Sequence, residues 1–473
     1  MRAVAVVLCV LWPLAVSAQT AQPGSSPTDD ESAIAAELRL ELESLKEDCA
    51  AFKKIGGCAA TLVTGHPLHL GVGSIAPQNG FGFGPAFVLT GTKGENWRLK
   101  WNSDAVGAPT SGAWRVGSYL KAVRTAVDLP QVVTGPSAGP LRPITIHEYP
   151  VFNLYAQTIS LPKLSYFGLG MNATRDAQTS FGMQQGIVGA SAIVPVLGRL
   201  QPWRLSLVAE LNGRFVDIRP GQADVPSIES RFSEATAPGL STQPTFAQFG
   251  EGLRFKPSLL DGHINLAYTA QLQQFVAGDS TYSFRRWTVD LSHEFPIYRN
   301  GAPVKSRDSN GPDECAVGPT AKTCPPLTRD RWGAVTVRAL ASKSSAGDDG
   351  VVPFYFQQTL GGSDINGNRA LASYDDYRFR GPHLFLVQES FEHSLFGVVG
   401  AWLQAEQGKV ALQHDSLLSG GQWERSFSLG LTVKAGGFPM LTIAWATGGP
   451  EGHHIALTID TSLLGGSSRP SLQ

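Results

Sequence analysis

The feature that most constrains the fold is a two-residue alternation of apolar and polar side chains, kept over whole segments of the chain. It occupies the stretches 264–273, 287–295, 425–433 and 454–460. Successive side chains of a β-strand point to opposite faces, so each stretch predicts a strand with one apolar face. In 425–433 that face would be formed by Phe427, Leu429, Leu431 and Val433.

The length of these segments separates two kinds of all-β protein. A soluble β-sandwich also alternates, but its strands are usually about 5–6 residues long. A tilted strand that crosses a bilayer needs about 9–11 residues, and several segments here reach that length. The alternation therefore favours a transmembrane β-barrel.

About sixteen candidate strands can be counted, and an even number suits a closed antiparallel barrel. Long Pro-, Gly- and Ser-containing connections are expected at 127–148, 218–244, 296–330 and 359–382, as for a barrel with short turns on one side and long loops on the other. The expected strands start near residues 81, 95, 112, 150, 179, 203, 245, 262, 282, 332, 351, 383, 398, 423, 437 and 453.

Charge and hydropathy argue against a nucleic-acid-binding protein and against a helical membrane protein. The 38 Lys and Arg residues balance 39 Asp and Glu residues, so no basic field points to nucleic acid. Beyond the first residues, no stretch has the apolar length of a spanning helix. The mean hydropathy of -0.05 suits strands that are only half apolar.

The N-terminus predicts export. Residues 1–18 have a basic start, a short apolar core and the small-residue end Val16-Ser17-Ala18, which is typical of a signal peptide. Residues 19–66 are expected to hold a linker and one amphipathic helix, opened by the capping box of Thr28 and Glu31. The favoured interpretation is a helix that packs on its own domain, in the periplasm or as a plug of the lumen; the alternatives are a helix that packs on a partner or on another copy of itself. Residues 67–473 are assigned to the barrel.

Four cysteines remain once Cys9 leaves with the signal peptide. They form two close pairs, Cys49 with Cys58 and Cys315 with Cys324. An oxidising periplasm would let each pair close a short disulfide loop, whereas neither pair has metal-site spacing.

No local signature of catalysis emerges. The one Gly-x-Ser-x-Gly sequence, around Ser137, lies in a Pro/Gly loop and not at a strand-to-helix turn. The adjacent His453 and His454 would point to opposite faces of a strand. We therefore expect a protein that is not an enzyme and has neither cofactor nor metal.

Several strings resemble the BamA/TamA (bacterial surface antigen) superfamily of outer-membrane barrels, whose members have sixteen strands. The resemblance covers most of the chain after residue 70. It is carried by LPKLSYFGLGMNATRDAQTSFG (161–182), PGLSTQPTFAQFGEGLRF (238–255), YSFRRWTVDLSHEFPI (282–297) and VPFYFQQTLGGSDINGNRALASYDDYRFRG (352–381).

The last string implies a loop between strands eleven and twelve that folds back into the lumen, with Gly361 and Gly362 at its mouth. In the family an Arg-Gly-Phe/Tyr motif braces this loop, but this chain has Ala372-Ser373-Tyr374 at that place. The candidate replacements for the motif arginine are Arg369, Arg378 and Arg380, and the candidate lumen carboxylates are Glu389 and Glu392. Lining of a wet pore by these arginines is the alternative.

Two further departures concern the ends. The 19–66 segment leaves no room for the periplasmic polypeptide-transport-associated (POTRA) repeats of the family, and the chain passes through Leu463 and Leu464 into a polar tail.

The resemblance implies an outer-membrane protein of a diderm bacterium. Its partners would be membrane lipid and, as candidates, client polypeptides or other envelope proteins. It would assist insertion or translocation of protein or lipid; the alternative is a passive or plugged pore without assembly activity. An outer-membrane hydrolase is a third, less favoured hypothesis.

Overall fold

The computed structural model describes residues 67–94, 96–125, 149–196, 204–260, 263–303, 328–396, 399–419, 421–435, 438–449, 451–459 and 469–473. The expected signal peptide, the helix within 19–66, all four cysteines and Ser137 lie outside these ranges. No helix within them is both long and apolar enough to cross a bilayer.

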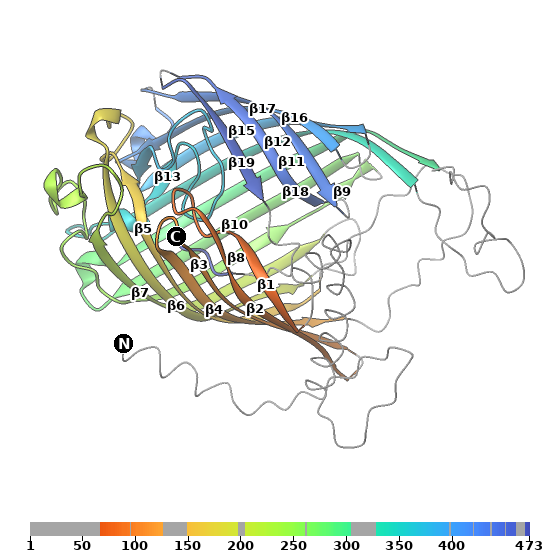
Figure 1. Ribbon diagram of the computed structural model, residues 1–473, viewed down its shortest axis with the longest axis horizontal. Helices are drawn as coiled ribbons and strands as arrows, with labels where there is room; N and C mark the ends of the chain where they lie inside the picture. Colours follow the sequence, from red (N-terminus) through yellow and green to blue (C-terminus); the bar gives the residue numbers. More distant parts are fainter. Residues whose placement is uncertain are drawn as a thin grey trace, which may run out of the picture.

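One large antiparallel sheet makes up the wall of the molecule, and it curls around an interior (Figure 1). Its 17 strands reduce to sixteen because the two-residue β9 continues β8 along the same edge of β10. The first half consists of β1 (Leu68–Ser74), β2 (Phe81–Lys93), β3 (Trp97–Ala108), β4 (Ala113–Arg124), β5 (Val151–Tyr166), β6 (Thr179–Pro195), β7 (Leu205–Pro220), β8 (Phe246–Phe255) and β9 (Ser258–Leu259). The second consists of β10 (Ile264–Ala277), β11 (Phe284–Pro303), β12 (Thr328–Ala346), β15 (His383–Phe396), β16 (Val399–Ala411), β17 (Glu424–Ala435), β18 (Phe438–Thr447) and β19 (His453–Ile459).

Each strand pairs with its neighbours in chain order, from β1 to β19. Between them lie the short hairpin of β13 (Gln358–Leu360) and β14 (Phe379–Gly381), and the 3-10 turns η2 (Arg175–Ala177), η3 (Ile228–Ser230), η5 (Ser280–Tyr282), η6 (Phe354–Phe356) and η7 (His414–Ser416). Within the described ranges no register joins β1 to β19, so closure of the wall stays a prediction.

Two expected strand positions need correction. The apolar run near residue 351 is not a strand of the wall; it forms η6 inside the sheet, where all three of its residues are buried. Pro353 precedes it and cannot donate to a strand ladder. The first strand, β1, was missed because it is only seven residues long and contains Gly71 and Gly73.

The expected gathering of long connections on one side is also wrong. Neighbouring strands run antiparallel, so only every second connection lies at the same end of the sheet. The connections after β7 and β12 share one end, whereas those after β4 and β11 leave from the opposite end.

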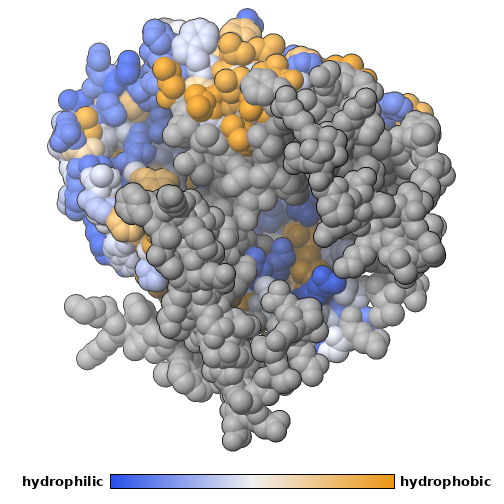
Figure 2. Space-filling view, turned by 45° about the vertical axis from the view of Figure 1, so that its right-hand side comes forward, coloured by the Kyte–Doolittle hydropathy of each residue, from blue (hydrophilic) through white to orange (hydrophobic). Residues whose placement is uncertain are grey.

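The polarity of the two faces is the reverse of that in a soluble protein. On β17 the apolar side chains of Phe427, Leu429 and Leu431 are 55%, 52% and 49% exposed, whereas Ser426 and Ser428 are buried. The same holds on β7, where Leu207, Leu211 and Phe215 are exposed, and Ser206, Asn212 and Arg214 are buried. Figure 2 shows apolar residues gathered along the upper outside of the wall and hydrophilic ones in the opening.

Candidate functional site

The connection between β12 and β15, residues 347–382, lies inside the sheet against its inner wall, and we call it the lumen loop. It is the connection between the eleventh and twelfth strands of the wall. It carries η6, β13 and β14, and it reaches strands on opposite sides of the sheet. The candidate site is therefore this loop together with the inner wall that holds it.

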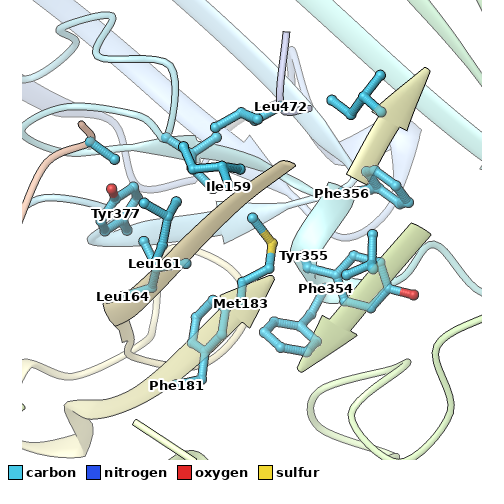
Figure 3. Packing of buried hydrophobic residues seen from close by; sticks show 14 of the residues in the cluster. Ile159, Leu161, Leu164, Phe181, Met183, Phe354, Tyr355, Phe356, Tyr377 and Leu472 are labelled. Atoms are coloured by element: carbon cyan, nitrogen blue, oxygen red, sulfur yellow. The ribbon is translucent and has the colours of Figure 1, made fainter. Parts of the chain in front are cut away.

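An aromatic cluster fixes the beginning of the lumen loop. Phe354 and Phe356 are 0% and 1% exposed. The ring of Phe354 lies edge-on to Tyr166 and Phe181, at centroid distances of 5.3 and 5.0 Å. Such edge contacts add to the hydrophobic gain of burial. Phe356 contacts the rings of Phe246, Phe275 and Phe284, which come from three successive strands of the wall. Figure 3 shows part of this cluster, with η6 packed against residues of the fifth and sixth strands.

Two buried arginines hold η6 through its backbone. Arg286 of β11 donates to the carbonyl oxygen of Phe356, and Arg380 of β14 donates to that of Phe354 at 2.7 Å. The Arg380 guanidinium also lies over the rings of Tyr166 and Phe354, at 5.7 and 5.8 Å. Burial lowers the pKa of Arg380 to about 10, which leaves it charged at neutral pH. The partners of these charges are thus neutral carbonyl oxygens and aromatic ring faces.

The two glycines at the mouth of the lumen loop occupy backbone conformations that other residues rarely adopt. Gly361 has φ 101° and Gly362 has φ 57°. A β-carbon at Gly362 would lie 2.4 Å from Asp376 Oδ1, and one at Gly361 would lie 2.4 Å from Arg378 Cβ. Both positions therefore require glycine for a positive φ and for close approach of the returning chain.

The residues aligned with the family motif anchor the far side of the loop. The Ala372 N–H donates to Glu406 Oε2 at 3.0 Å, and the Ser373 N–H donates to Ser426 Oγ at 3.0 Å. The Tyr374 hydroxyl donates to Glu424. Burial, followed by Glu424, raises the pKa of Tyr374, so its phenol keeps the proton that it donates.

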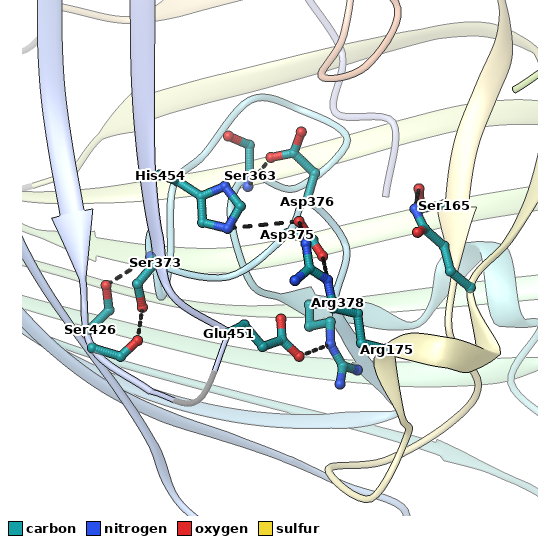
Figure 4. A network of polar contacts seen from close by, with 12 residues as sticks. Ser165, Arg175, Ser363, Ser373, Asp375, Asp376, Arg378, Ser426, Glu451 and His454 are labelled. Carbon is teal, nitrogen blue, oxygen red and sulfur yellow. Dashed lines mark hydrogen bonds and ion pairs between the residues drawn. The ribbon is translucent and has the colours of Figure 1, made fainter. Parts of the chain in front are cut away.

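Arg378 has a carboxylate partner other than the predicted Glu389 and Glu392. Its Nε donates to Glu451, in the turn between β18 and β19, and the two side chains are only 6% and 8% exposed. Its guanidinium also lies 5.0 Å from the Phe167 ring centre and 4.7 Å from that of Phe379. Figure 4 shows this ion pair reaching from the lumen loop to the turn after β18.

A second ion pair ties the loop to the connection between β5 and β6. Asp375 Oδ2 lies 2.9 Å from Arg175 Nε, and Asp375 Oδ1 lies 3.7 Å from His454 Nε2. Its neighbour Asp376 accepts the Ser363 N–H at 2.8 Å. Burial raises the pKa of Asp376, although this hydrogen bond and the Arg369 charge oppose the shift.

The remaining predicted residues take other places. Arg369 contributes its carbonyl oxygen, which accepts from Gln388 at 3.1 Å, while burial lowers the pKa of its guanidinium. Glu389 is exposed on the outer face, and Glu392 is half-buried on the same face as Gln388. The structure therefore brings Gly361, Gly362, Tyr374, Arg378 and Arg380 together in one docked loop.

Sequence reasoning missed the groups that receive this loop, which are Arg286, Glu406 and Glu424 on wall strands and Glu451 in the turn after β18. The available signal was the occurrence of charged residues on the polar face of otherwise alternating strands, as for Arg286 and Glu406. Within the described ranges, no group of three or more His, Cys, Asp or Glu side chains could hold a metal ion.

Two solved structures are similar to this chain at low identity. BamA from Haemophilus ducreyi lacking POTRA domains 1–3 is 11% identical with a TM-score of 0.45, over 82% of this chain and 68% of that one. CdiB from Escherichia coli is 13% identical with a TM-score of 0.45, over 83% of this chain and 61% of that one. The chain thus spans about three fifths of CdiB. No protein-family model matches this chain, and no curated protein does.

Proposed function

We propose that this chain is a BamA/TamA-type β-barrel of the outer membrane of a diderm bacterium, and that it assists insertion or translocation of polypeptide or lipid there. The observation that carries the proposal is the lumen loop between the eleventh and twelfth strands, docked on the inner wall through Tyr374 and Arg378. This is the loop that the sequence resemblance singles out. Its anchors lie next to the last strands of the sheet, of which β19 is the edge strand.

The membrane location is supported by the wall itself. The strands from β2 to β18, apart from β9 and the interior hairpin, have between 10 and 20 residues, which suffices to cross a bilayer at a tilt. Their exposed face is mainly apolar, and their interior face carries buried Gln, Asn, Ser and Arg side chains. A wall with this polarity is stable only when lipid covers the outside.

The proposal includes closure of the wall between β1 and β19, an N-terminal helix at the barrel and disulfides within each cysteine pair. The two edge strands have seven residues each, which matches them in length. Mass spectrometry of periplasm-matured protein should find Cys49 joined to Cys58 and Cys315 joined to Cys324. Four free thiols would contradict the disulfides.

A plugged structural barrel without client activity is the second candidate. It is favoured by the packing of η6 into an aromatic cluster that contacts five strands of the wall, with Phe354 and Phe356 almost fully buried. Such a plug would serve a barrel that only closes its own lumen.

Conductance and depletion together test the two candidates. We expect purified protein in planar bilayers to lack a steady open channel, and depletion to lower the outer-membrane level of other barrels or of surface lipid. A steady channel with unchanged envelope composition would overturn the proposal. No channel and no change in composition would leave the plugged structural barrel.

A further inference from the structure

Residues 469–473 come after the last strand, β19, in the chain, and they lie inside the sheet (Figure 1). Leu472 and Gln473 are 6% and 7% exposed, and Pro470 is also buried. Leu472 belongs to the interior hydrophobic cluster and lies near Ile159 in Figure 3. We call these five residues the tail segment.

The tail segment is held at both ends by groups far away in the sequence. Arg469 Nη2 donates to Asp104 Oδ2 of β3 at 2.8 Å. The Leu472 N–H donates to Asn366 Oδ1 at 2.7 Å, and Gln473 Nε2 donates to the carbonyl oxygen of Gln357 at 3.1 Å. The segment thereby connects the wall at β3 to the lumen loop.

Each receiving group is fixed by contacts that do not involve the tail segment. Asp104 is paired with Arg115 at 3.0 Å. The Asn366 N–H donates to Asp364 at 2.9 Å, which holds the turn at the tip of the loop. The Gln357 side chain donates to the carbonyl oxygen of Val352 at 3.0 Å. Removal of the tail segment would therefore leave a preformed receptor.

The contacts define a ligand by its chemistry. The basic side chain of Arg469 pairs with the carboxylate of Asp104. Three residues later, the branched apolar side chain of Leu472 packs in the hydrophobic cluster, and the Leu472 N–H donates to Asn366. The next residue adds a side-chain amide. In the amide orientation that satisfies both partners, Gln185 of β6 also donates to the Leu472 carbonyl oxygen at 3.2 Å. Recognition of a charge, an apolar side chain and two backbone groups is specific to a peptide.

We propose that the interior carries a peptide-binding site, occupied in cis by the tail segment, for short peptides with a basic residue three positions before a branched apolar residue. A tethered ligand competes at a high effective concentration, so the intact chain holds its own site filled. Release of the tail segment opens the site to a second peptide and frees the lumen loop from β3. The site is independent of whether the barrel assists assembly.

The test uses the full chain and a variant lacking residues 469–473, both in detergent micelles, with a fluorescein-labelled peptide Arg-Pro-Ser-Leu-Gln. Fluorescence anisotropy should show saturable binding to the shortened variant and at least about tenfold weaker binding to the full chain. Asp104→Asn in the shortened variant should weaken binding about tenfold, and so should replacement of the peptide's arginine by glutamine. The two changes combined should weaken binding no more than either change alone, because both remove the same ion pair. Asp217→Asn, at an exposed ion pair with Arg219, is the matched control and should leave binding unchanged.

Absence of saturable binding to a shortened variant that still shows the folded mobility shift in unheated gels would overturn the proposal. Binding that is indifferent to Asp104→Asn and to the peptide's arginine would do the same. If the shortened variant fails to fold, the full-length Arg469→Gln/Leu472→Ala variant replaces it. That variant should bind the peptide at least about tenfold more tightly than the unaltered chain, and equal affinity would overturn the proposal.

Discussion

Replacement of Glu451 by Met should release the lumen loop, because it leaves the buried Arg378 guanidinium without its carboxylate. The two side chains are 6% and 8% exposed, so water cannot take over the role of the lost partner. Removal of one member of a buried ion pair costs about 3–5 kcal/mol. Since about 1.4 kcal/mol corresponds to a factor of ten, the open fraction of the loop should rise between about a hundredfold and a few thousandfold.

Trypsin cleavage at Arg369 measures this opening. When the loop closes faster than it is cut, the cleavage rate follows the equilibrium population of the open form. Glu451→Met keeps all the arginines of the loop, so the cleavage sites themselves are unchanged. The cleavage rate at Arg369 should therefore rise by the same factor as the open fraction.

Two further variants serve as controls for the cleavage rate of Glu451→Met. The double variant Arg378→Met/Glu451→Met replaces the ion pair by two apolar side chains and should recover most of the lost stability, as replacement of a buried pair commonly does. Asp217→Asn removes one partner of an ion pair that is about half exposed, and it should change the rate by less than about fivefold. A Glu451→Met variant that is cut at Arg369 within about twofold of the unaltered chain would refute the reasoning.

Three other outcomes follow from single positions. Gly362→Ala should destabilise loop docking more than Gly367→Ala. Both glycines have a positive φ, but only the β-carbon added at Gly362 would collide with Asp376. The two variants are compared by their rates of trypsin cleavage at Arg369. Leu429→Arg places a charge on the exposed apolar face and should cost about 2–4 kcal/mol in a bilayer, seen as less folded protein in membrane fractions. Burial raises the pKa of Asp376, so the unaltered loop gains docking stability as the pH falls through that raised value towards 3.8. Hydrogen exchange of the loop, corrected for intrinsic exchange rates, should show this rise in protection at lower pH in the unaltered chain. The Asp376→Asn variant should show no such rise.

Most strand positions could be predicted from the sequence because the alternation is a local property. The expected starts near 81, 179, 383 and 453 are the observed starts of β2, β6, β15 and β19. The strand expected near residue 351 is wrong for a physical reason: a short apolar run is compatible both with a strand and with a turn that is buried on all sides. Only the aromatic cluster around η6, drawn from distant strands, decides between them.

The candidate site was accessible in part through the family resemblance. The string 352–381 places Gly361 and Gly362 at the mouth of the loop, and both glycines have a positive φ in the structure. The partner of Arg378 could not be found in this way. Glu451 lies 73 residues away in a turn, and only the register of the last strands brings it to the loop.

The two sides of the lumen loop are held by different chemistry, and this difference decides which side can open. Arg286 and Arg380 donate hydrogen bonds to backbone carbonyl oxygens of η6, which are not ionisable. Aromatic packing of η6 adds to these hydrogen bonds. The segment 372–378 depends instead on the carboxylates of Glu406, Glu424 and Glu451. Substitution of one of these carboxylates removes an anchor only on this second side. The lumen loop should therefore open at 372–378 while η6 stays docked, so that η6 acts as the fixed end of any movement of the loop.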